Sequence, residues 1–434
     1  KNDLFIENIS IKKLAKKFST PFYCYSSNTI IQKYKKFELP FRNSDTIICY
    51  AVKANPNIAI LKILSNLGAG AEVVSAGELR RALKAGINVK KIVFSGVGKT
   101  EDEIKLAVKK RVLLINMESE SEAVLINKVS KKISKKTSVG IRLNPNITGK
   151  THKKISTGSK HDKFGLDYID CINLCKKINN FKNLKLEGLS VHIGSQITNV
   201  KPFKQVLRVI DKIIFKTKIN FKFIDLGGGM GISYSNKEKK LSLNQYAKIV
   251  NRFVKNKKSK IIFEPGRFIA ANTSILISKV IYIKKSSRKN FIVLDAGMND
   301  LMRPALYNAY HKIIPLKKNK KKILKNVEFV GPICESSDKF LSLRNFNIKV
   351  NLMSKIDVLL VTPPSRIDVY QGLSNEYAAI EPPVWSSLIA NYLLKRNYNV
   401  QILDAEADNL TPEQTAKKII SIDPKLAVFM VYGQ

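Results

Sequence analysis

Eight short apolar runs, separated by helical patterns, constrain the fold of this chain more than any other feature. Apolar residues recur at helical spacing between the runs, for example over residues 58–67, 77–85 and 203–215. Eight strands that alternate with helices predict a closed barrel of parallel strands, a TIM barrel. A doubly wound open sheet is the alternative, but it seldom contains eight regular units. The runs are residues 47–55, 71–75, 92–96, 112–116, 138–144, 186–194, 223–229 and 261–267.

Most of the unusual residues lie at the C-terminal ends of these runs. Lys53 ends the first run, His192 lies in the sixth, three glycines end the seventh, and Glu264 lies in the eighth. The C-terminal ends of the strands carry the active site in TIM-barrel enzymes. We therefore expect these side chains to converge in space although they are far apart in sequence.

Lys53 has two interpretations. An isolated lysine at a strand end usually extends its aliphatic stem along the barrel rim and keeps its amine in water. The alternative is a desolvated amine with a lowered pKa, which is suited to forming a Schiff base. The neighbouring chemistry decides between the two.

That chemistry consists of a glycine triplet, a carboxylate and a histidine. Gly227, Gly228 and Gly229 can turn backbone N–H groups towards a phosphate, although a tight turn explains them equally well. Ser195 could add a phosphate contact. Glu264 could pair with Arg267 or hold a proton on a cofactor's ring nitrogen. His192 could stack on the cofactor's ring or be an ordinary core histidine.

Cys334 lies beyond the barrel, in Gly-Pro-Ile-Cys-Glu-Ser-Ser-Asp. A lone cysteine is usually a packing residue. Two nearby carboxylates, Glu335 and Asp338, would favour its thiol form. The segment therefore predicts a proton donor rather than a nucleophile.

The composition excludes several functional classes. The formal net charge is +42, but the lysines are scattered and no aromatic residues interleave with them, so we expect no specific nucleic-acid site. No apolar stretch is long enough to span a membrane. The five cysteines show no disulfide or metal-site spacing, so we expect a reducing, cytoplasmic compartment and no metal. No secretory signal opens the sequence, and it begins with Lys1 rather than Met, so we expect the natural start to lie upstream.

The charge changes sign along the chain. Residues 356–434 contain six basic and nine acidic residues, a net charge of −3, whereas residues 1–355 contain 70 and 25, a net charge of +45. This break predicts two units of different history, joined near Lys355.

Eight ordered motifs resemble those of the diaminopimelate decarboxylases, a family of fold-type III enzymes that use pyridoxal phosphate. The resemblance covers about residues 5 to 345. The motifs are Tyr50-Ala-Val-Lys-Ala-Asn, Ala71-Glu-Val-Val-Ser-Ala-Gly-Glu-Leu, Lys163-Phe-Gly-Leu, His192-Ile-Gly-Ser-Gln, Asp225-Leu-Gly-Gly-Gly, Glu264-Pro-Gly-Arg, Met302-Arg-Pro-Ala-Leu-Tyr and Cys334-Glu-Ser-Ser-Asp.

The resemblance implies a role for each matching residue. Lys53 would hold pyridoxal phosphate covalently, and Cys334 would return a proton to the substrate. The family supplies the Cys-Glu segment from the partner subunit, so the resemblance also implies a homodimer with a shared active site. The other cofactor contacts would be His192, Ser195, Gly227, Gly228, Gly229, Glu264, Gly266 and Arg267. The substrate's far end would be bound by Arg267, Arg303, Tyr307 and Glu335.

The chain departs from the family after Asp338. The family's C-terminal strands, with an Ala-Tyr-Gly segment whose tyrosine contacts the cofactor, are absent. Residues 356–434 instead resemble the start of the cobalamin-binding-like domain of radical S-adenosylmethionine enzymes, without its Asp-x-His-x-x-Gly signature or a Cys-x-x-x-Cys-x-x-Cys cluster. The expected domains are an N-terminal segment (1–30) that joins a β domain, a TIM barrel (31–270), an incomplete β domain (271–345) and a partial doubly wound, Rossmann-like α/β domain (356–434).

The resemblance implies decarboxylation of meso-2,6-diaminopimelate to L-lysine and carbon dioxide. Two alternatives remain open at this point. One is an inactive fusion that only binds pyridoxal phosphate, and the other is a cobalamin or interaction module on a degenerate barrel. An absorbance spectrum distinguishes the three, because each bound group gives different bands.

Overall fold

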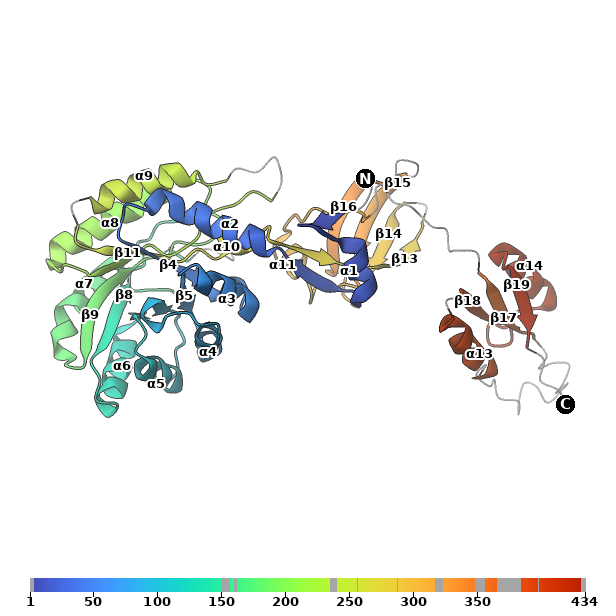
Figure 1. The fold of residues 1–434 in the computed structure, drawn as a ribbon, viewed down its shortest axis with the longest axis horizontal. Coiled ribbons are helices and arrows are strands. Elements are labelled where there is room, and N and C mark those ends of the chain that lie inside the picture. The colour runs from blue at the N-terminus through green and yellow to red at the C-terminus, as the bar shows by residue number, and fades with distance from the viewer. Residues whose placement is uncertain are drawn as a thin grey trace. The chain divides into compact units, whose positions relative to one another are not determined.

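The computed structural model confirms the closed eight-stranded barrel (Figure 1). The eight strands are parallel, and their order around the barrel is β10-β11-β4-β5-β6-β7-β8-β9. The strands are β4 (Thr46–Ala51), β5 (Gly70–Val73), β6 (Ile92–Phe94), β7 (Leu114–Met117), β8 (Thr137–Arg142), β9 (Leu184–Ser190), β10 (Phe223–Asp225) and β11 (Lys260–Phe263). The structure describes residues 4–149, 157–159, 162–234, 240–255, 257–286, 288–316, 323–347, 356–364, 384–396 and 398–430.

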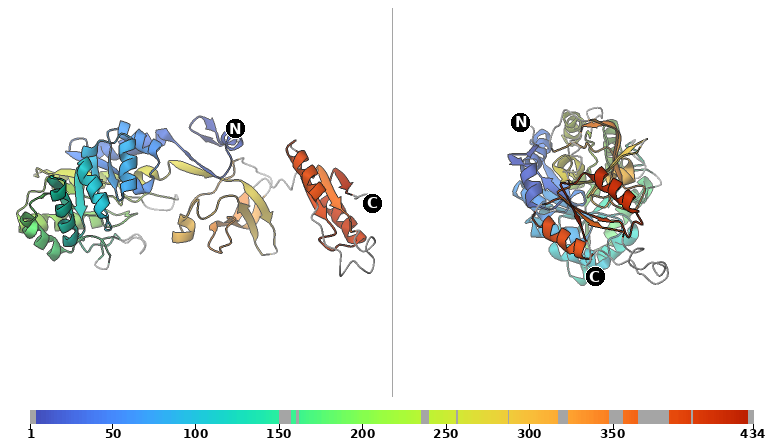
Figure 2. Two further views of the ribbon diagram at one scale, coloured as in Figure 1. Left: turned by 90° about the horizontal axis from the view of Figure 1, so that it is seen from below. Right: turned by 90° about the vertical axis from the view of Figure 1, so that its right-hand side faces the viewer.

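Helices surround the barrel strands, as both views show (Figures 1 and 2). Most begin at a side chain that accepts a hydrogen bond from the first turn. Ser75, for example, accepts from the backbone N–H of Glu78, and Thr100 forms a capping box with Glu103. The helices are α2 (Ser27–Glu38), α3 (Ile58–Asn66), α4 (Ala76–Lys84), α5 (Glu101–Lys110), α6 (Glu120–Lys132), α7 (Tyr168–Lys177), α8 (Lys201–Thr217), α9 (Leu243–Val254) and α10 (Arg267–Ala270).

The barrel has two apolar layers because side chains alternate along each strand. In β4, Ile47 and Cys49 belong to a small cluster that also contains Leu114 and Phe223. Ile48 and Tyr50 belong to the larger cluster, which includes residues of the surrounding helices. Strand burial on both faces explains why the strands appear as continuous apolar runs in the sequence.

A group of antiparallel and mixed strands follows the barrel. Strand β3 (Phe22–Tyr25) from the N-terminal segment pairs with β12 (Ser274–Ile277). A four-stranded sheet has the order β13-β14-β15-β16. The remaining elements of this part are β1 (Phe5–Ile6), β2 (Ile9–Ser10), α1 (Ile11–Lys17), β13 (Val280–Lys284), β14 (Asn290–Leu294), α11 (Arg303–Tyr307), β15 (Ile323–Val330) and β16 (Lys339–Asn347).

The chain divides into two compact units. The first contains Lys1–Lys318 and Leu324–Phe346, and the second contains Asn319–Ile323 and Asn347–Gln434. In the second unit a parallel sheet of order β18-β17-β19 packs Leu359, Val361 and Leu403 into a core of its own. Its elements are β17 (Val358–Thr362), α13 (Val384–Leu394), β18 (Val400–Asp404), α14 (Pro412–Ile422) and β19 (Leu426–Phe429). The expected join near Lys355 lies outside the described residues.

No helix among the described residues is both long enough and apolar enough to cross a bilayer.

Candidate active site

The barrel strands are shorter than the apolar runs that predicted them. Strand β4 ends at Ala51, so Lys53 lies in a single 3-10 turn, Val52–Ala54, rather than in the strand. Strands β10 and β11 end at Asp225 and Phe263. The glycine triplet and Glu264 therefore lie in loops at the C-terminal face of the barrel, where backbone N–H groups are not occupied by the sheet.

Lys53 forms an ion pair at this face. Its Nζ lies 2.6 Å from Oε2 of Glu72, the third residue of β5. The Glu72 side chain is 1% exposed, whereas that of Lys53 is half exposed. The carboxylate is therefore fixed in the wall of the barrel, and it directs the lysine amine.

The expected lowered pKa of Lys53 is wrong for this state of the protein. Burial lowers the pKa of the amine, but the charge of Glu72 and its hydrogen bond to the amine outweigh burial and raise the pKa above its ordinary value. Desolvation alone would lower the pKa of Lys53, but the neighbouring strand β5 brings the carboxylate of Glu72 to the same face.

The glycine triplet forms a tightly packed loop. Gly227 and Gly229 have φ angles of 61° and 90°, in the region that favours glycine. A Cβ on Gly228 would lie 2.2 Å from the carbonyl oxygen of Glu264. The N–H of Gly228 donates to Nδ1 of His192 over 3.2 Å. The loop is therefore packed closely against the segment that carries Glu264, and its backbone is hydrogen-bonded to His192.

Glu264 is one half of a buried carboxyl pair with Asp225. Burial and the neighbouring Asp225 raise the pKa of Glu264 well above its ordinary value. Asp225 accepts hydrogen bonds from Asn116 Nδ2 at 3.0 Å, Ser190 Oγ at 3.1 Å and the Gly227 N–H at 2.9 Å. Asp225 therefore has the better hydrogen-bonded carboxylate, and the shared proton belongs on Glu264.

One oxygen of Glu264, Oε1, is buried and has no hydrogen-bond partner among the described residues. Such a group is costly unless something else satisfies it. The sequence alternative of a salt bridge between Glu264 and Arg267 is not what the structure shows. Arg267 donates instead to Oε1 of Gln196 over 3.4 Å. Gly266 is the N-cap residue of α10, which Arg267 begins.

His192 is electrically neutral. Burial lowers the pKa of its imidazole well below the ordinary value, and the charges of Arg142 and Lys53 lower it further. Arg142, at the end of β8, donates to Glu118 over 2.7 Å. Ser195 is half buried, three residues after His192. A neutral ring at this position is compatible with stacking on a flat ligand.

Arg303 and Tyr307 belong to α11, outside the barrel. The guanidinium Cζ of Arg303 lies 4.4 Å from the centre of the Tyr234 ring, and its Nη1 lies 2.9 Å from Nε2 of His311. Tyr234 lies on the loop that follows the glycine triplet. Arg303 is therefore brought next to the loop that follows the glycine triplet.

Cys334 and Glu335 are exposed on the loop between β15 and β16. Within the part of the chain that the structure describes, no contact joins them to Lys53. The buried carboxylate of Asp338 accepts from the backbone N–H groups of Met298 and Ile333, at 2.7 and 2.8 Å. Asp338 therefore holds the loop in shape, a role that the sequence argument did not foresee.

Four contributors were missed at the sequence level: Glu72, Asp225, Tyr234 and His311. Asp225 is the last residue of β10 and Glu72 is the last but one of β5, so the pattern that found the other residues could have identified both. Tyr234 and His311 lie in irregular segments, where no periodic pattern indicates a contact.

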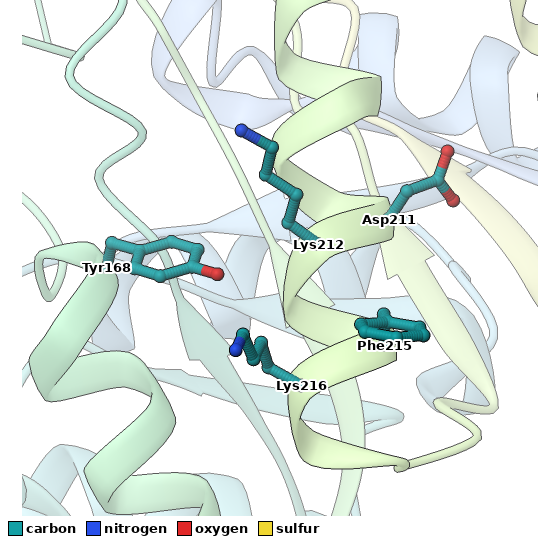
Figure 3. Close-up of a pocket in the computed structure, with 5 residues that line it drawn as sticks. All are labelled: Tyr168, Asp211, Lys212, Phe215 and Lys216. Atoms are coloured by element: carbon teal, nitrogen blue, oxygen red, sulfur yellow. The ribbon is translucent and has the colours of Figure 1, made fainter.

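A hollow of about 550 Å³ lies elsewhere, on the outside of the barrel (Figure 3). Its lining side chains come from α7 and α8, and they are Tyr168, Asp211, Lys212, Phe215 and Lys216. None of them is among the residues at the C-terminal face. The hollow is therefore not part of the site described above.

Comparisons with known proteins agree with this geometry. Residues 27–271 match the family model described as pyridoxal-dependent decarboxylase, pyridoxal binding domain. The chain is 43% identical over 345 residues to diaminopimelate decarboxylase of Aquifex aeolicus, covering 79% of this chain and 81% of the relative. It is 40% identical over 337 residues to the Helicobacter pylori enzyme of the same name, covering 77% and 83%.

Solved structures give the same result. Diaminopimelate decarboxylase from Helicobacter pylori, complexed with L-lysine, has a TM-score of 0.73 and 38% identity, covering 78% of this chain and 85% of that one. The enzyme from M. jannaschii, also in complex with L-lysine, has a TM-score of 0.75 and 37% identity, covering 80% and 83%.

Proposed function

The chain belongs to the diaminopimelate decarboxylase family of pyridoxal-dependent decarboxylases, and from this premise we propose how its side chains share the work. It is a carboxy-lyase that uses pyridoxal phosphate to convert meso-2,6-diaminopimelate to L-lysine and carbon dioxide, the last step of lysine biosynthesis. The observation that carries the assignment of the site is the convergence of Lys53, Glu264 and the glycine loop at one end of the barrel.

The residues present fit pyridoxal phosphate. The buried Oε1 of Glu264 lacks a partner among the described residues, and a pyridine nitrogen would supply one. The Gly227–Gly229 loop would present its backbone to the phosphate, and Ser195, Gly266 and Arg267 would complete the contacts. Lys53 stands with its amine at the same face.

Each of these side chains has a distinct task. Bound pyridoxal phosphate supplies an electron sink for the charge that remains when carbon dioxide leaves. Lys53 would hold the cofactor covalently, and Glu72 would direct its amine and take up its proton. Glu264 would hold a proton at the ring nitrogen. His192, being neutral, would contact the ring face without opposing that proton.

The far end of the substrate carries an amine and a carboxylate, and complementary groups are available. Arg267 and Arg303 would bind the carboxylate, Glu335 the amine, and Tyr307 would contribute a hydroxyl. The thiol of Cys334 would deliver a proton to the carbon that has lost carbon dioxide. We propose that Cys334 and Glu335 are supplied by the second subunit of a homodimer.

Borohydride reduction of the protein with its cofactor, followed by peptide mapping, tests the assignment of Lys53. The pyridoxyl group should lie on Lys53 alone. Lys53→Ala should lose the visible absorbance of the bound cofactor, whereas Lys128→Ala, at an exposed position on α6, should keep it. A pyridoxyl group on any other lysine would refute the assignment.

Selectivity for diaminopimelate is tested with ornithine. Ornithine has only an amine at its far end, so Arg303 would be left without its anion, at a cost of a few kcal/mol if buried. We expect carbon dioxide release from diaminopimelate and little from ornithine. Equal release from both substrates would contradict the proposed role of Arg303.

We further propose that residues 356–434 form an α/β unit of the cobalamin-binding-like kind. The parallel order of β18, β17 and β19 supports this. No histidine follows His311 in the sequence, so this unit offers no imidazole to a cobalt ion. Titration with hydroxocobalamin tests the proposal, because binding would shift the absorbance bands. The five free cysteines support a cytoplasmic location, which remains a proposal.

A further inference from the structure

The ring of Tyr234 contacts two arginines. The Cζ atom of Arg303 lies 4.4 Å from the ring centre, and that of Arg267 lies 5.9 Å from it. Both distances are within the range of cation–π attraction. Arg267 begins α10 and Arg303 begins α11, so residues far apart in sequence meet on one aromatic ring. Both arginines are those proposed to bind the substrate's far carboxylate.

His311 completes the cluster. Its ring meets the Tyr234 ring edge to face, with 5.8 Å between the centres. Its Nε2 lies 2.9 Å from Nη1 of Arg303. A guanidinium only donates hydrogen bonds, so Nε2 is the acceptor and the imidazole is neutral, with its proton on Nδ1. Burial, and then the charge of Arg303, lower the pKa of His311 to about 4, in agreement with this assignment.

An arginine side chain needs such support to recognise a carboxylate. Its long chain has many rotamers, and ordering them on binding costs free energy. A guanidinium that is already held at one orientation loses less on binding, so the ligand binds more tightly. Tyr234 packs against the face of the Arg303 guanidinium and His311 is hydrogen-bonded to its edge, so both restrict its rotation.

We propose that Tyr234 and His311 are positioning residues, which hold Arg303 ready for the carboxylate at the substrate's far end. This inference rests on the proposed function, because it requires Arg303 to bind that carboxylate. It adds two residues that act through Arg303. These residues contribute to binding of the substrate's far end and not to the chemical step.

L-lysine provides a probe that is independent of the chemical step. Decarboxylation removes one carboxyl group and leaves the other amino-acid end of the substrate intact. The product therefore carries the same far end as diaminopimelate. If Arg303 is no longer held in position, the KM for diaminopimelate and the inhibition constant of L-lysine should rise in parallel.

The experiment compares Tyr234→Leu with Tyr234→Phe, and His311→Leu with His311→Gln, in the enzyme with its cofactor. We expect Tyr234→Leu and His311→Leu to raise both constants about tenfold, with kcat changed less than about threefold. Tyr234→Phe keeps the aromatic face and His311→Gln keeps an acceptor, so both should recover most of the loss. Tyr282→Leu, at an exposed tyrosine on β13, is the control.

A double-mutant cycle shows whether Tyr234 acts through Arg303. In an Arg303→Gln background, Tyr234→Leu should change the inhibition constant of L-lysine by less than about twofold, because the group that it positions is gone. The absorbance of the bound cofactor should be the same in all variants.

Two outcomes separate the inference from the function on which it rests. If Arg303→Gln weakens L-lysine binding but the leucine variants do not, the positioning role is wrong and the proposed role of Arg303 stands. If Arg303→Gln itself leaves L-lysine binding unchanged, the proposed role of Arg303 fails, and the positioning role fails with it. Leucine variants that lower kcat but leave the KM for diaminopimelate and the inhibition constant of L-lysine unchanged would also overturn the inference.

Discussion

A single proton is central to the cofactor side of the site, because Asp225 and Glu264 cannot both be ionised at low cost in a buried position. Asp225 accepts three hydrogen bonds, whereas Glu264 Oε1 has no partner among the described residues. Glu264 is therefore the group that keeps the proton. The protonation of Glu264 therefore follows from the hydrogen bonds that stabilise the neighbouring carboxylate of Asp225.

Replacing Asp225 by Asn tests this assignment. The substitution removes the neighbouring charge that helps to raise the pKa of Glu264, so Glu264 should ionise more readily. In the protein without cofactor, the infrared band of a protonated carboxyl group should be present at neutral pH. It should be lost in Glu264→Gln and weakened in Asp225→Asn, where burial still raises the pKa of Glu264. Asp102→Asn, at an exposed position on α5, should retain it. A band that persists in Glu264→Gln would assign the proton to another group.

His311 makes stability depend on pH. Its pKa is about 4 in the folded protein and about 6.5 when unfolded, so the unfolded state binds more protons between these values. The free energy of unfolding should therefore fall as the pH is lowered from about 6.5 to about 4, by about 1–2 kcal/mol after allowing for the partial exposure of the ring.

Denaturant unfolding of the wild type and of His311→Asn, measured across this pH range, isolates the contribution, since the other titrating groups are common to both. The difference in stability between the two proteins should shrink as the pH falls. A difference that does not change with pH would show that His311 is not held neutral.

The residues that the sequence could identify are those that end a regular element. Lys53 and Glu264 follow buried strands, and a barrel places all such positions on one face. The pKa of Lys53 could not be predicted, because it depends on an ion pair with Glu72, which lies on the neighbouring strand β5. Tyr234 and His311 could not be predicted either, because their contact joins two irregular segments.

At the scale of elements, the apolar runs located all eight barrel strands but overran the C-terminal ends of all except β7. Gly227 and Gly229 have positive φ angles, which end β10 although the apolar pattern continues to the next residues. The short strands matter for function, because residues beyond the last sheet hydrogen bond can turn towards a ligand. An apolar pattern reports burial, and burial continues past the end of the sheet.

The glycine loop yields a prediction about packing. In Gly228→Ala the new Cβ would lie 2.2 Å from the carbonyl oxygen of Glu264, so the loop must move. We expect a loss of about 1–3 kcal/mol in the free energy of unfolding. We also expect the protein to lose pyridoxal phosphate more readily during dialysis, which the visible absorbance of the bound cofactor measures. Gly98→Ala is the matched control, because nothing lies within 4 Å of its Cβ.

Gly228→Ala with the stability and cofactor retention of Gly98→Ala would show that the loop is not closely packed against Glu264.

At the scale of the whole molecule, the change of charge along the chain lies in the same stretch as the break between the two units at Phe346. Each unit has its own apolar core. Composition could indicate this break because two units that fold separately need not share a surface charge. The domain boundaries at 30, 270 and 345 remain predictions.

A shared active site predicts complementation between inactive variants. Lys53→Ala lacks the proposed cofactor lysine and Cys334→Ala lacks the proposed proton donor, so each variant should be nearly inactive alone. If Cys334 serves the other subunit, a mixed dimer contains one site with both groups. Unfolding and refolding the two variants together should restore up to about a quarter of wild-type activity. Activity that stays at the level of the separate variants would mean that Cys334 serves its own subunit.

The sheet that carries Cys334 predicts a limit on activity. Its edges are β13 and β16, and Cys334 lies on the loop that leads into β16. The Aquifex aeolicus relative is matched over 81% of its length. The described strands of the second unit form a parallel sheet of their own, β18-β17-β19. Unpaired edges favour aggregation, and a poorly held Cys334 loop would impair proton delivery in both subunits.

Replacing residues 346–434 with the C-terminal segment of that relative should therefore raise lysine formation, by roughly a hundredfold if proton delivery is the step that suffers. Lysine formation and oligomeric state are measured for the original chain, for this chimera and for a chain that stops at Asn347. The shortened chain separates the two causes. Its activity should equal that of the original chain if the missing strands matter. Its activity should equal that of the chimera if the second unit interferes. An original chain that is already a dimer with the turnover of the chimera would show that residues after Phe346 complete the site.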